Sequence, residues 1–202
     1  LDWAVRMVLL IGIPSAVALI LLAEPLLTTL FHYGEMTDRD VSMAAMSLRA
    51  YGLGLLAFML IKVLAPGYFS RQDTKTPVKI AVKAMVANMV FNLILIFPLA
   101  HAGLALATAL SAFMNAGWLL HGLIKQGVFK WQTGWLRWSM QLLFANALMA
   151  AVILLFAPAA SDWLSAGLWQ RVEWMFLLVA SAVLVYCAAL ILSGVRIRHL
   201  RG

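Results

Sequence analysis

Six long apolar segments divide this chain of 202 residues, and they constrain its fold more than any other feature. A helix needs about 20 apolar residues to cross the roughly 30 Å hydrocarbon core of a bilayer. In that core a helix satisfies its backbone hydrogen bonds internally. The sequence therefore predicts an all-α, polytopic membrane protein with six transmembrane helices, at about Ala4–Leu22, Val41–Leu64, Pro77–Phe97, Ala102–Ile124, Leu136–Phe156 and Trp174–Leu192.

The composition excludes an ordinary soluble domain. Hydrophobic residues make up 64% of the chain and charged residues only 11%, whereas soluble domains are near 45–50% apolar and about 25% charged. The net charge of +7 would suggest nucleic acid as a partner of a soluble protein. Here the cations occur in short segments between apolar runs, which suits anionic lipid headgroups. We therefore expect contacts with membrane lipids and no nucleic-acid partner.

The charges also predict an orientation. Twelve of the 15 Lys and Arg residues fall on the side of the membrane that holds the start of the chain, and six of the eight acids fall on the other side. The positive-inside rule then places both ends of the chain in the cytoplasm. Because the sequence begins at Leu1 without a signal-peptide pattern, we expect a fragment of a longer protein. The basic side holds Arg6, Lys62, Arg71, Lys75, Lys79, Lys83, Lys125, Lys130, Arg137, Arg196, Arg198 and Arg201.

Turn-forming residues predict where several helices begin and end. Thr37 can cap the start of the second helix. Pro66-Gly67 is typical of a helix end, and Thr76-Pro77 of a helix start with Thr as the cap and Pro in the first helical position. Pro98 is expected to end the third helix, and the sequence PLAHAG that begins there leaves room only for a tight hairpin. Seven of the eight tryptophans lie near predicted helix ends, which is typical of the aromatic belt at a membrane surface.

No catalytic motif is found. The four histidines form no metal-ligand spacing with each other or with the single cysteine, and no GxSxG or P-loop sequence occurs. Paired carboxylates within the apolar segments, which would mark a proton relay, are absent from the sequence. We therefore predict no enzyme activity, no catalytic residue, no metal site and no cofactor.

Two cations of the second predicted helix are candidates for a substrate pathway. Arg49 is expected roughly 10 Å below the membrane surface, where contact with lipid would cost on the order of 2–3 kcal/mol. It should therefore face a water-filled cavity or extend its side chain to the surface, and the sequence leaves both open. Lys62 is either a boundary lysine that reaches the surface or a phosphate contact at the cytoplasmic mouth of a pathway.

Polar side chains within the third and fourth helices form a second group. Asn88 and Asn92 share one helix face, and Thr108, Ser111 and Asn115 share another. In hydrocarbon such groups are expected to bond to neighbouring helices, each bond contributing about 0.6–2 kcal/mol. A contact with substrate is the alternative.

One stretch resembles a known family. The sequence KVLAPGYFSRQDTKTPVKIA resembles the loop between the tenth and eleventh helices of the MurJ/MviN lipid II flippases. The resemblance continues in HAGLALATALSAFMNA and in LFHYGEMTDRD. It implies part of a MOP-type exporter fold of about 14 helices. Residues 1–124 would then be the last four helices of the second lobe, and residues 125–202 an extra C-terminal pair.

The same resemblance implies a function. The family moves lipid II, a peptidoglycan precursor on a polyprenyl pyrophosphate, outward across the bacterial inner membrane by alternating access. An ion gradient or the membrane potential is implied as the energy source, and the missing N-terminal lobe as a partner. The extra helical pair would form a groove for the lipid tail. Residues of the matching loop would serve as a cytoplasmic gate, and with Arg49 they make up the candidate pathway: Lys62, Arg71, Asp73, Lys75, Thr76 and Lys79.

Other functions remain open at this stage. A related MOP-superfamily exporter, such as an O-antigen-type lipid-sugar flippase or a drug antiporter, would share the fold. A non-transporting membrane scaffold would lack intramembrane cations that face water. A membrane enzyme acting on polyprenyl phosphates would need clustered acids, and Asp73 alone does not make such a site.

Overall fold

The computed structural model describes residues 1–194, so Arg196, Arg198 and Arg201 lie outside the described residues. Residues 1–194 are 85% helical and contain no strand, which confirms the all-α prediction. The helices are α1 (Asp2–Leu21), α2 (Ala23–Phe31), α3 (Asp38–Phe69), α4 (Lys75–Lys125), α5 (Trp135–Phe156), α6 (Ala160–Ser165) and α7 (Leu168–Leu192).

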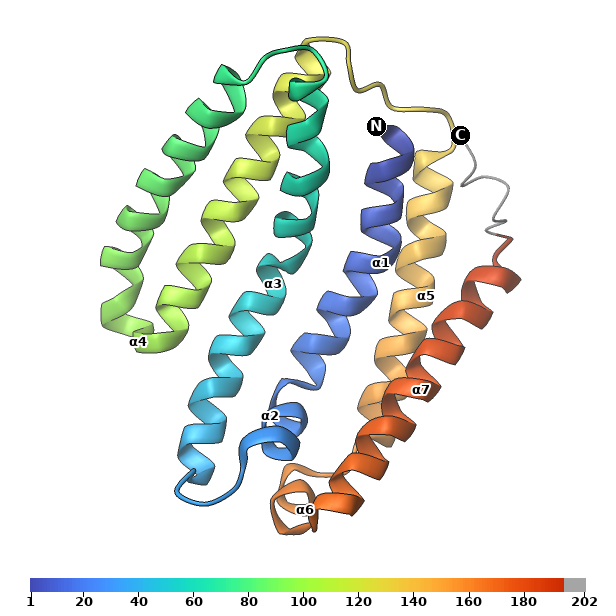
Figure 1. The fold of residues 1–202 in the computed structure, drawn as a ribbon. Helices are drawn as coiled ribbons and strands as arrows, with labels where there is room; N and C mark the ends of the chain where they lie inside the picture. Colours follow the sequence, from blue (N-terminus) through green and yellow to red (C-terminus); the bar gives the residue numbers. More distant parts are fainter. Residues whose placement is uncertain (195–202) are drawn as a thin grey trace.

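Five of these helices, α1, α3, α4, α5 and α7, are long and apolar enough to cross a membrane. The difference from the six predicted segments comes from α4, whose 51 residues are continuous except at Ala100. There φ is 45° and ψ is −122°, and the helix folds back into two antiparallel arms (Figure 1). The break lies two residues after Pro98, within the predicted hairpin. Gly103 permits it, because an added Cβ would overlap the Leu95 carbonyl.

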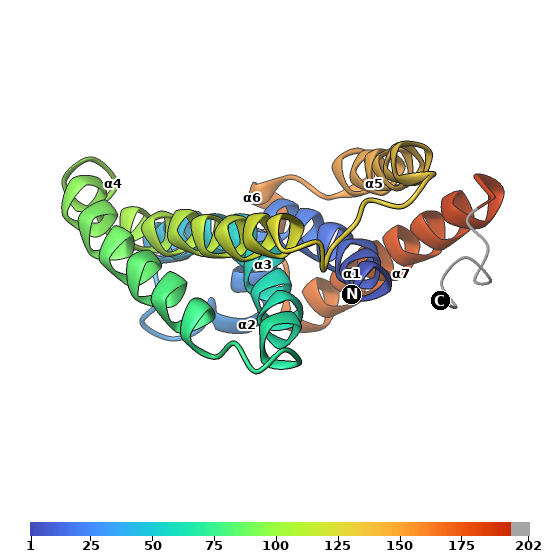
Figure 2. The same ribbon diagram turned by 90° about the horizontal axis from the view of Figure 1, so that it is seen from above.

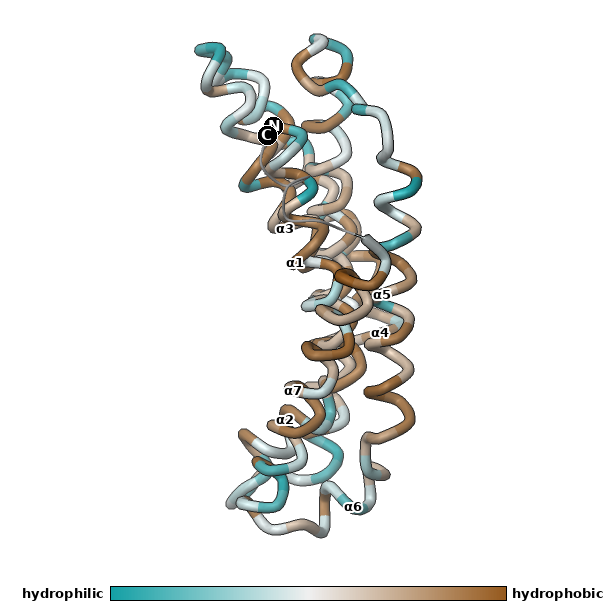
Figure 3. The backbone as a smooth tube through the Cα atoms, turned by 90° about the vertical axis from the view of Figure 1, so that its right-hand side faces the viewer, coloured by the Kyte–Doolittle hydropathy of each residue, from teal (hydrophilic) through white to brown (hydrophobic). Residues whose placement is uncertain are grey.

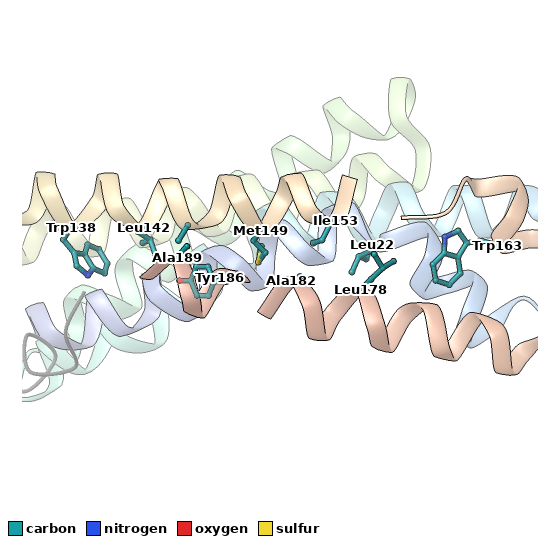
Figure 4. Close-up of a cluster of buried hydrophobic side chains, with 11 residues drawn as sticks. Leu22, Trp138, Leu142, Met149, Ile153, Trp163, Leu178, Ala182, Tyr186 and Ala189 are labelled. Carbon is teal, nitrogen blue, oxygen red and sulfur yellow. The ribbon is translucent and has the colours of Figure 1, made fainter. Parts of the chain in front are cut away.

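The helices pack around α1. It contacts α3 on one side and α5 on the other, while α3 packs on α4 and α5 on α7 (Figure 2). One apolar core joins α1, α5, α6 and α7, and Figure 4 shows its side chains between these helices. A second core joins α1 to the ends of α3 and α4 through Val5, Leu64 and Leu123. Trp138 and Trp163 are only 6% and 1% exposed, so these two tryptophans belong to the first core and are not lipid-facing anchors.

Charged and polar residues gather at the two ends of the bundle, and apolar residues line its middle (Figure 3). The N-terminus and the connections 70–74 and 126–134 lie at one end (Figure 1). We call this the basic end, because it carries the predicted cytoplasmic cations. The opposite end holds α2, α6, the start of α3 and the fold-back of α4 (Figure 1). We call it the acidic end.

Two short helices at the acidic end were not predicted. Helix α2 follows α1 after a break at Leu22, and α6 lies in the connection from α5 to α7. Helix α7 begins at Leu168, six residues before the predicted start, with Gly167 as its N-cap. These elements are short or polar at their ends, so the hydropathy pattern that indicates a membrane span does not reveal them.

The predicted end of α3 at Pro66-Gly67 is wrong, because the helix continues to Phe69. Pro66 removes one backbone donor, but its own carbonyl accepts the Ser70 N–H at 3.0 Å. The extra turn is held by α4. The hydroxyl of Tyr68, which is fully buried, donates to the Leu119 carbonyl at 2.8 Å. Tertiary packing therefore outweighs the local stop signal.

The predicted start of α4 is also wrong, because the helix begins two residues earlier than predicted. The helix begins at Lys75 with Thr74 in the N-cap position, and Pro77 occupies the third helical position. A proline there costs no helical bond, because the first four N–H groups of a helix have no intrahelical partner. The Thr76 N–H is satisfied by Asp73 Oδ1 at 3.0 Å, so Asp73 rather than Thr76 provides the cap.

Candidate functional site

Arg49 lies on α3 and pairs with an acid of α2. Its Nη2 atom is 3.2 Å from Glu24 Oε2, and the two side chains are 43% and 31% exposed. The pair lines a small cavity of about 170 Å³ with Pro158 and Trp163 at the acidic end. An exposed ion pair of this kind contributes about 0–1 kcal/mol to stability. The sequence does not reveal Glu24 as the partner, because Glu24 lies beyond the predicted end of the first helix at Leu22.

The predicted gate residues lie on three consecutive elements at the basic end. Lys62 is exposed on α3, and Arg71 is exposed in the connection 70–74. Lys75 and Lys79 are exposed in the first turns of α4. Within residues 1–194 no ion pair joins these four cations to a carboxylate. The structure therefore presents them as exposed surface charges without an acidic partner in this part of the chain.

Asp73 and Thr76 are the two gate residues that contact each other. Besides accepting the Thr76 N–H, the Asp73 carboxylate is hydrogen-bonded by the Thr76 side chain. The side chain of Thr76 and then its backbone N–H lower the pKa of Asp73 below its ordinary value. This contact fixes the entry into α4, and so gives the pair a structural role in the connection.

The five predicted intramembrane polar residues gather between the arms of α4. Asn88 Nδ2 donates to Ser111 Oγ at 3.1 Å and to Thr108 Oγ1 at 3.4 Å, so it joins the two arms. Asn92 Nδ2 donates to Asn88 Oδ1 at 2.9 Å. The Oδ1 atoms of Asn92 and Asn115 are buried without a hydrogen-bond partner among residues 1–194.

Four of these five polar residues border a cavity of about 370 Å³ between α3 and the two arms. Asn88, Thr108, Ser111 and Asn115 line it together with apolar side chains that include Phe58. Unsatisfied amide oxygens are costly in an apolar environment. The cavity thus places a few polar groups, including the unsatisfied Asn115 amide oxygen, among mostly apolar walls.

Two apolar cavities lie beside α7. One, of about 490 Å³, is bounded by α5 and α7 and lined by Val152, Phe156 and Leu177. The other, of about 470 Å³, lies between α1 and α7 and is lined by Pro14, Val183 and Tyr186. Both are lined almost wholly by hydrocarbon, so they suit an acyl or polyprenyl chain rather than a polar headgroup.

Sequence reasoning missed a buried arginine at the acidic end. Arg171 is only 5% exposed and donates to the Thr28 carbonyl at 3.1 Å and to the Leu164 carbonyl at 2.9 Å. Its Nη2 atom is also 3.3 Å from His32 Nδ1, and His32 Nε2 is 2.9 Å from Asp38 Oδ1. The scarcity of cations at this end was the signal that could have singled it out.

Metal ligands are not assembled in the described part of the chain. Among residues 1–194, no group of three or more His, Cys, Asp or Glu side chains is placed to hold a metal ion. The candidate site residues are thus cations, amides, hydroxyls and the single carboxylate Asp73, which accepts the Thr76 N–H.

Comparison with known proteins decides the family. The family model described as lipid II flippase MurJ matches residues 1–171. The chain belongs to the MurJ family. A probable lipid II flippase MurJ of Haemophilus influenzae is 46% identical over 200 residues, which cover 99% of this chain and 39% of that protein. One of Vibrio cholerae is 45% identical over 202 residues, which cover 100% of this chain and 38% of that protein.

A solved MurJ structure shares the fold. The lipid II flippase MurJ in its inward closed conformation superposes with a TM-score of 0.75 over 97% of this chain and 38% of that one, at 24% identity. The chain thus spans about two fifths of the length of the MurJ proteins that it matches. Together with the five apolar helices, family membership makes this chain part of a multi-pass membrane protein.

Proposed function

We propose that the full-length protein containing this chain moves lipid II from the cytoplasmic to the periplasmic leaflet of the bacterial inner membrane, for cell wall synthesis. The observation that carries the proposal is the match of the MurJ family model to residues 1–171. Transport proceeds by alternating access between this part of the protein and the N-terminal lobe. An ion gradient or the membrane potential supplies the energy, and no cofactor takes part.

The two apolar cavities beside α7 are the proposed place of the lipid tail. An apolar polyprenyl chain is not stabilised in a hydrated cavity. The pyrophosphate and sugars of the headgroup, in contrast, need a hydrated path across the membrane. The groove lined by Val183 and Tyr186 lets the tail stay in an apolar environment while the headgroup moves. Residues 125–202 thus serve as the tail-binding pair, and residues 1–124 as part of the second lobe.

The connection 70–74 is the proposed cytoplasmic gate element. It joins α3 to α4 at the basic end, which the positive-inside rule assigns to the cytoplasm together with both ends of this chain. The exposed cations Lys62, Arg71, Lys75 and Lys79 would attract the pyrophosphate of lipid II at the mouth of the pathway. Nearer the acidic end, the headgroup would contact Arg49 by taking the place of Glu24 as its partner.

Depletion of the full-length protein in cells tests the flippase assignment. Lipid II should become inaccessible to a probe outside the inner membrane, although its synthesis continues. A strain without any other lipid II flippase is required, since a redundant transporter would mask the effect. Unchanged accessibility in that strain would show that the protein does not flip lipid II.

Filling the groove tests the tail site separately. Val183→Trp places a large side chain in the cavity between α1 and α7, and should reduce lipid II transport about tenfold by excluding the tail. Leu184→Trp is the matched control, because Leu184 is the next residue of α7 and lines neither cavity. Equal transport activity of the two variants would show that the lipid tail does not bind in this groove. The flippase assignment would not be affected.

A further inference from the structure

A cavity of about 300 Å³ at the basic end has no part in the proposed transport pathway. It lies where α1, the connection 126–134, α5 and Gly194, just after α7, meet. Arg6 and Arg137 line it, together with Thr133, Trp138 and Gln141. Unlike the grooves beside α7, this cavity is lined by two cations and several hydrogen-bond donors, so its chemistry suits an anion.

Arg6 is fixed in place by its neighbours. Its Nε atom is 2.9 Å from Asp2 Oδ2, and its side chain is only 12% exposed. The guanidinium stacks on the rings of Trp135 and Trp138, with distances of 4.9 and 5.7 Å to the ring centroids. Asp2 is itself held by the Trp135 indole N–H at 2.7 Å. A guanidinium ordered in this way loses little conformational entropy when it binds a ligand.

The charges of this cavity do not cancel. Asp2 balances Arg6, but among residues 1–194 no carboxylate forms an ion pair with Arg137. Gln141 Nε2 donates to the Ser193 carbonyl at 2.6 Å and closes the wall between α5 and the end of α7. The cavity thus keeps a net positive charge, and an anion that enters it would meet two arginines.

The position of the cavity identifies the anion. The 22 residues of α5 span about 33 Å, which matches the hydrocarbon thickness, so the first turn of α5 lies at headgroup level. Trp131 is exposed there, as expected for the membrane interface. Leu136 and Met140, both exposed on α5, offer apolar surface beside the cavity for an acyl chain. A free anion would make no use of that surface.

We propose that this cavity binds the phosphate of an anionic phospholipid headgroup, with Arg6 and Arg137 as its two cationic contacts. Thr133 supplies a hydroxyl donor at the rim. A zwitterionic lipid carries the same phosphate, but its own cation opposes entry beside two arginines. The site therefore selects phosphatidylglycerol over phosphatidylcholine, and it binds a lipid of the surrounding membrane rather than the transported one.

The test uses the full-length protein in vesicles, with a fluorophore on Gln132→Cys as the only cysteine. Gln132 is exposed beside the cavity but does not line it. Quenching by phosphatidylglycerol with a nitroxide high on its acyl chain is compared with quenching by phosphatidylcholine labelled in the same way. We expect Arg137→Gln to lower the preference for phosphatidylglycerol about fivefold, which corresponds to ~1 kcal/mol for one cation near the surface.

The matched control removes two cations from the same end of the molecule. Lys125 and Lys130 are exposed and lie outside the cavity, so Lys125→Gln with Lys130→Gln should change the preference less than twofold. Arg137→Lys keeps the charge and should keep most of the preference for phosphatidylglycerol. That result would show that the loss in Arg137→Gln comes from the missing charge and not from a folding defect. A second variant, Arg6→Gln with Arg137→Gln, should lower the preference about 25-fold.

Three results would overturn the proposal. The first is an equal loss in the arginine and lysine pairs, which would mean that only the overall surface charge attracts the lipid. The second is an unchanged preference after Arg137→Gln. The third is displacement of phosphatidylglycerol by millimolar inorganic phosphate at constant ionic strength, which would mean that the cavity binds a free anion.

Discussion

The two ends of this bundle use charge in opposite ways. At the acidic end, charged side chains join helices that are far apart in sequence. Arg171 of α7 donates to the carbonyl groups of Thr28 and Leu164, and Arg49 of α3 pairs with Glu24 of α2. The contact of His32 with Asp38 joins the end of α2 to the start of α3.

At the basic end, packing joins the helices and most cations face outward. The Tyr68 hydroxyl bonds to α4, and an added Cβ at Gly122 would overlap it. The rings of Phe129, Trp131 and Trp135 meet edge to face at centroid distances of 5.0 and 4.9 Å along the chain. The cations that set topology and meet headgroups are mostly left unpaired, Arg6 with Asp2 being the exception, so apolar contacts provide most of the packing at that end.

Among the substitutions that test this comparison, replacing Arg171 should have the largest effect on the free energy of unfolding. Arg171→Met keeps an unbranched apolar stem but leaves the Thr28 and Leu164 carbonyls without their donor, which should cost about 3 kcal/mol of unfolding free energy. Thermal and denaturant unfolding of the purified full-length protein measure it. Arg137→Met, at an exposed cation of the basic end, should cost no more than about 0.5 kcal/mol. Equal losses would show that the two ends do not differ.

Gly122→Ala probes the packing of the basic end. The new Cβ overlaps the Tyr68 hydroxyl, so the interface of α3 with α4 must shift at a cost of about 1–3 kcal/mol. Gly117→Ala is the control on the same helix, since its Cβ meets no atom within 4 Å and should add up to about 1 kcal/mol of stability. Tyr68→Phe should relieve the clash in the Gly122→Ala background. Unfolding midpoints that fall equally for both glycines would contradict the packing account.

Local sequence patterns predicted most of the fold. Hydropathy located the membrane segments, and PLAHAG located the fold-back at Ala100, because both depend on residues close together in the chain. Thr37 was likewise predicted as a cap, and it forms a capping box with Asp40. The ends at Pro66 and Thr76 were misplaced, since the packing of Tyr68 on α4 and the carboxylate of Asp73 decide them.

The candidate site was less predictable. The polar residues of α4 could be grouped by helical spacing, and Asn88 does join the two arms. The partners of Arg49 and Arg171 come from other helices, at separations of 25 and 143 residues from Glu24 and Thr28. No periodicity in a single sequence contains such pairings, because tertiary packing sets them.

The pair of Arg49 and Glu24 should contribute less than Arg171, because both side chains are partly exposed. A double-mutant cycle with Arg49→Gln and Glu24→Gln should give a coupling of about 0.2–1 kcal/mol in unfolding free energy. High salt should reduce this coupling. A coupling above about 2 kcal/mol would mean that the pair is desolvated in the full-length protein, and would place it among the buried contacts of the acidic end.

The smallest effect is expected at Asp73, in the connection between α3 and α4. Asp73→Ala removes the acceptor of the Thr76 N–H, so this amide should exchange with solvent severalfold faster, as measured by hydrogen-exchange mass spectrometry. Thr74→Ala is the control, because Thr74 occupies the N-cap position without a side-chain bond.

The pKa of Asp73 is lowered from 3.8, so its contribution is present above that pH and is lost as the pH falls through the lowered value. The protection of the Thr76 amide should therefore decline in acid in the original protein but not in Asp73→Ala. Equal protection in both at neutral pH would show that the α4 entry at the basic end does not depend on this carboxylate.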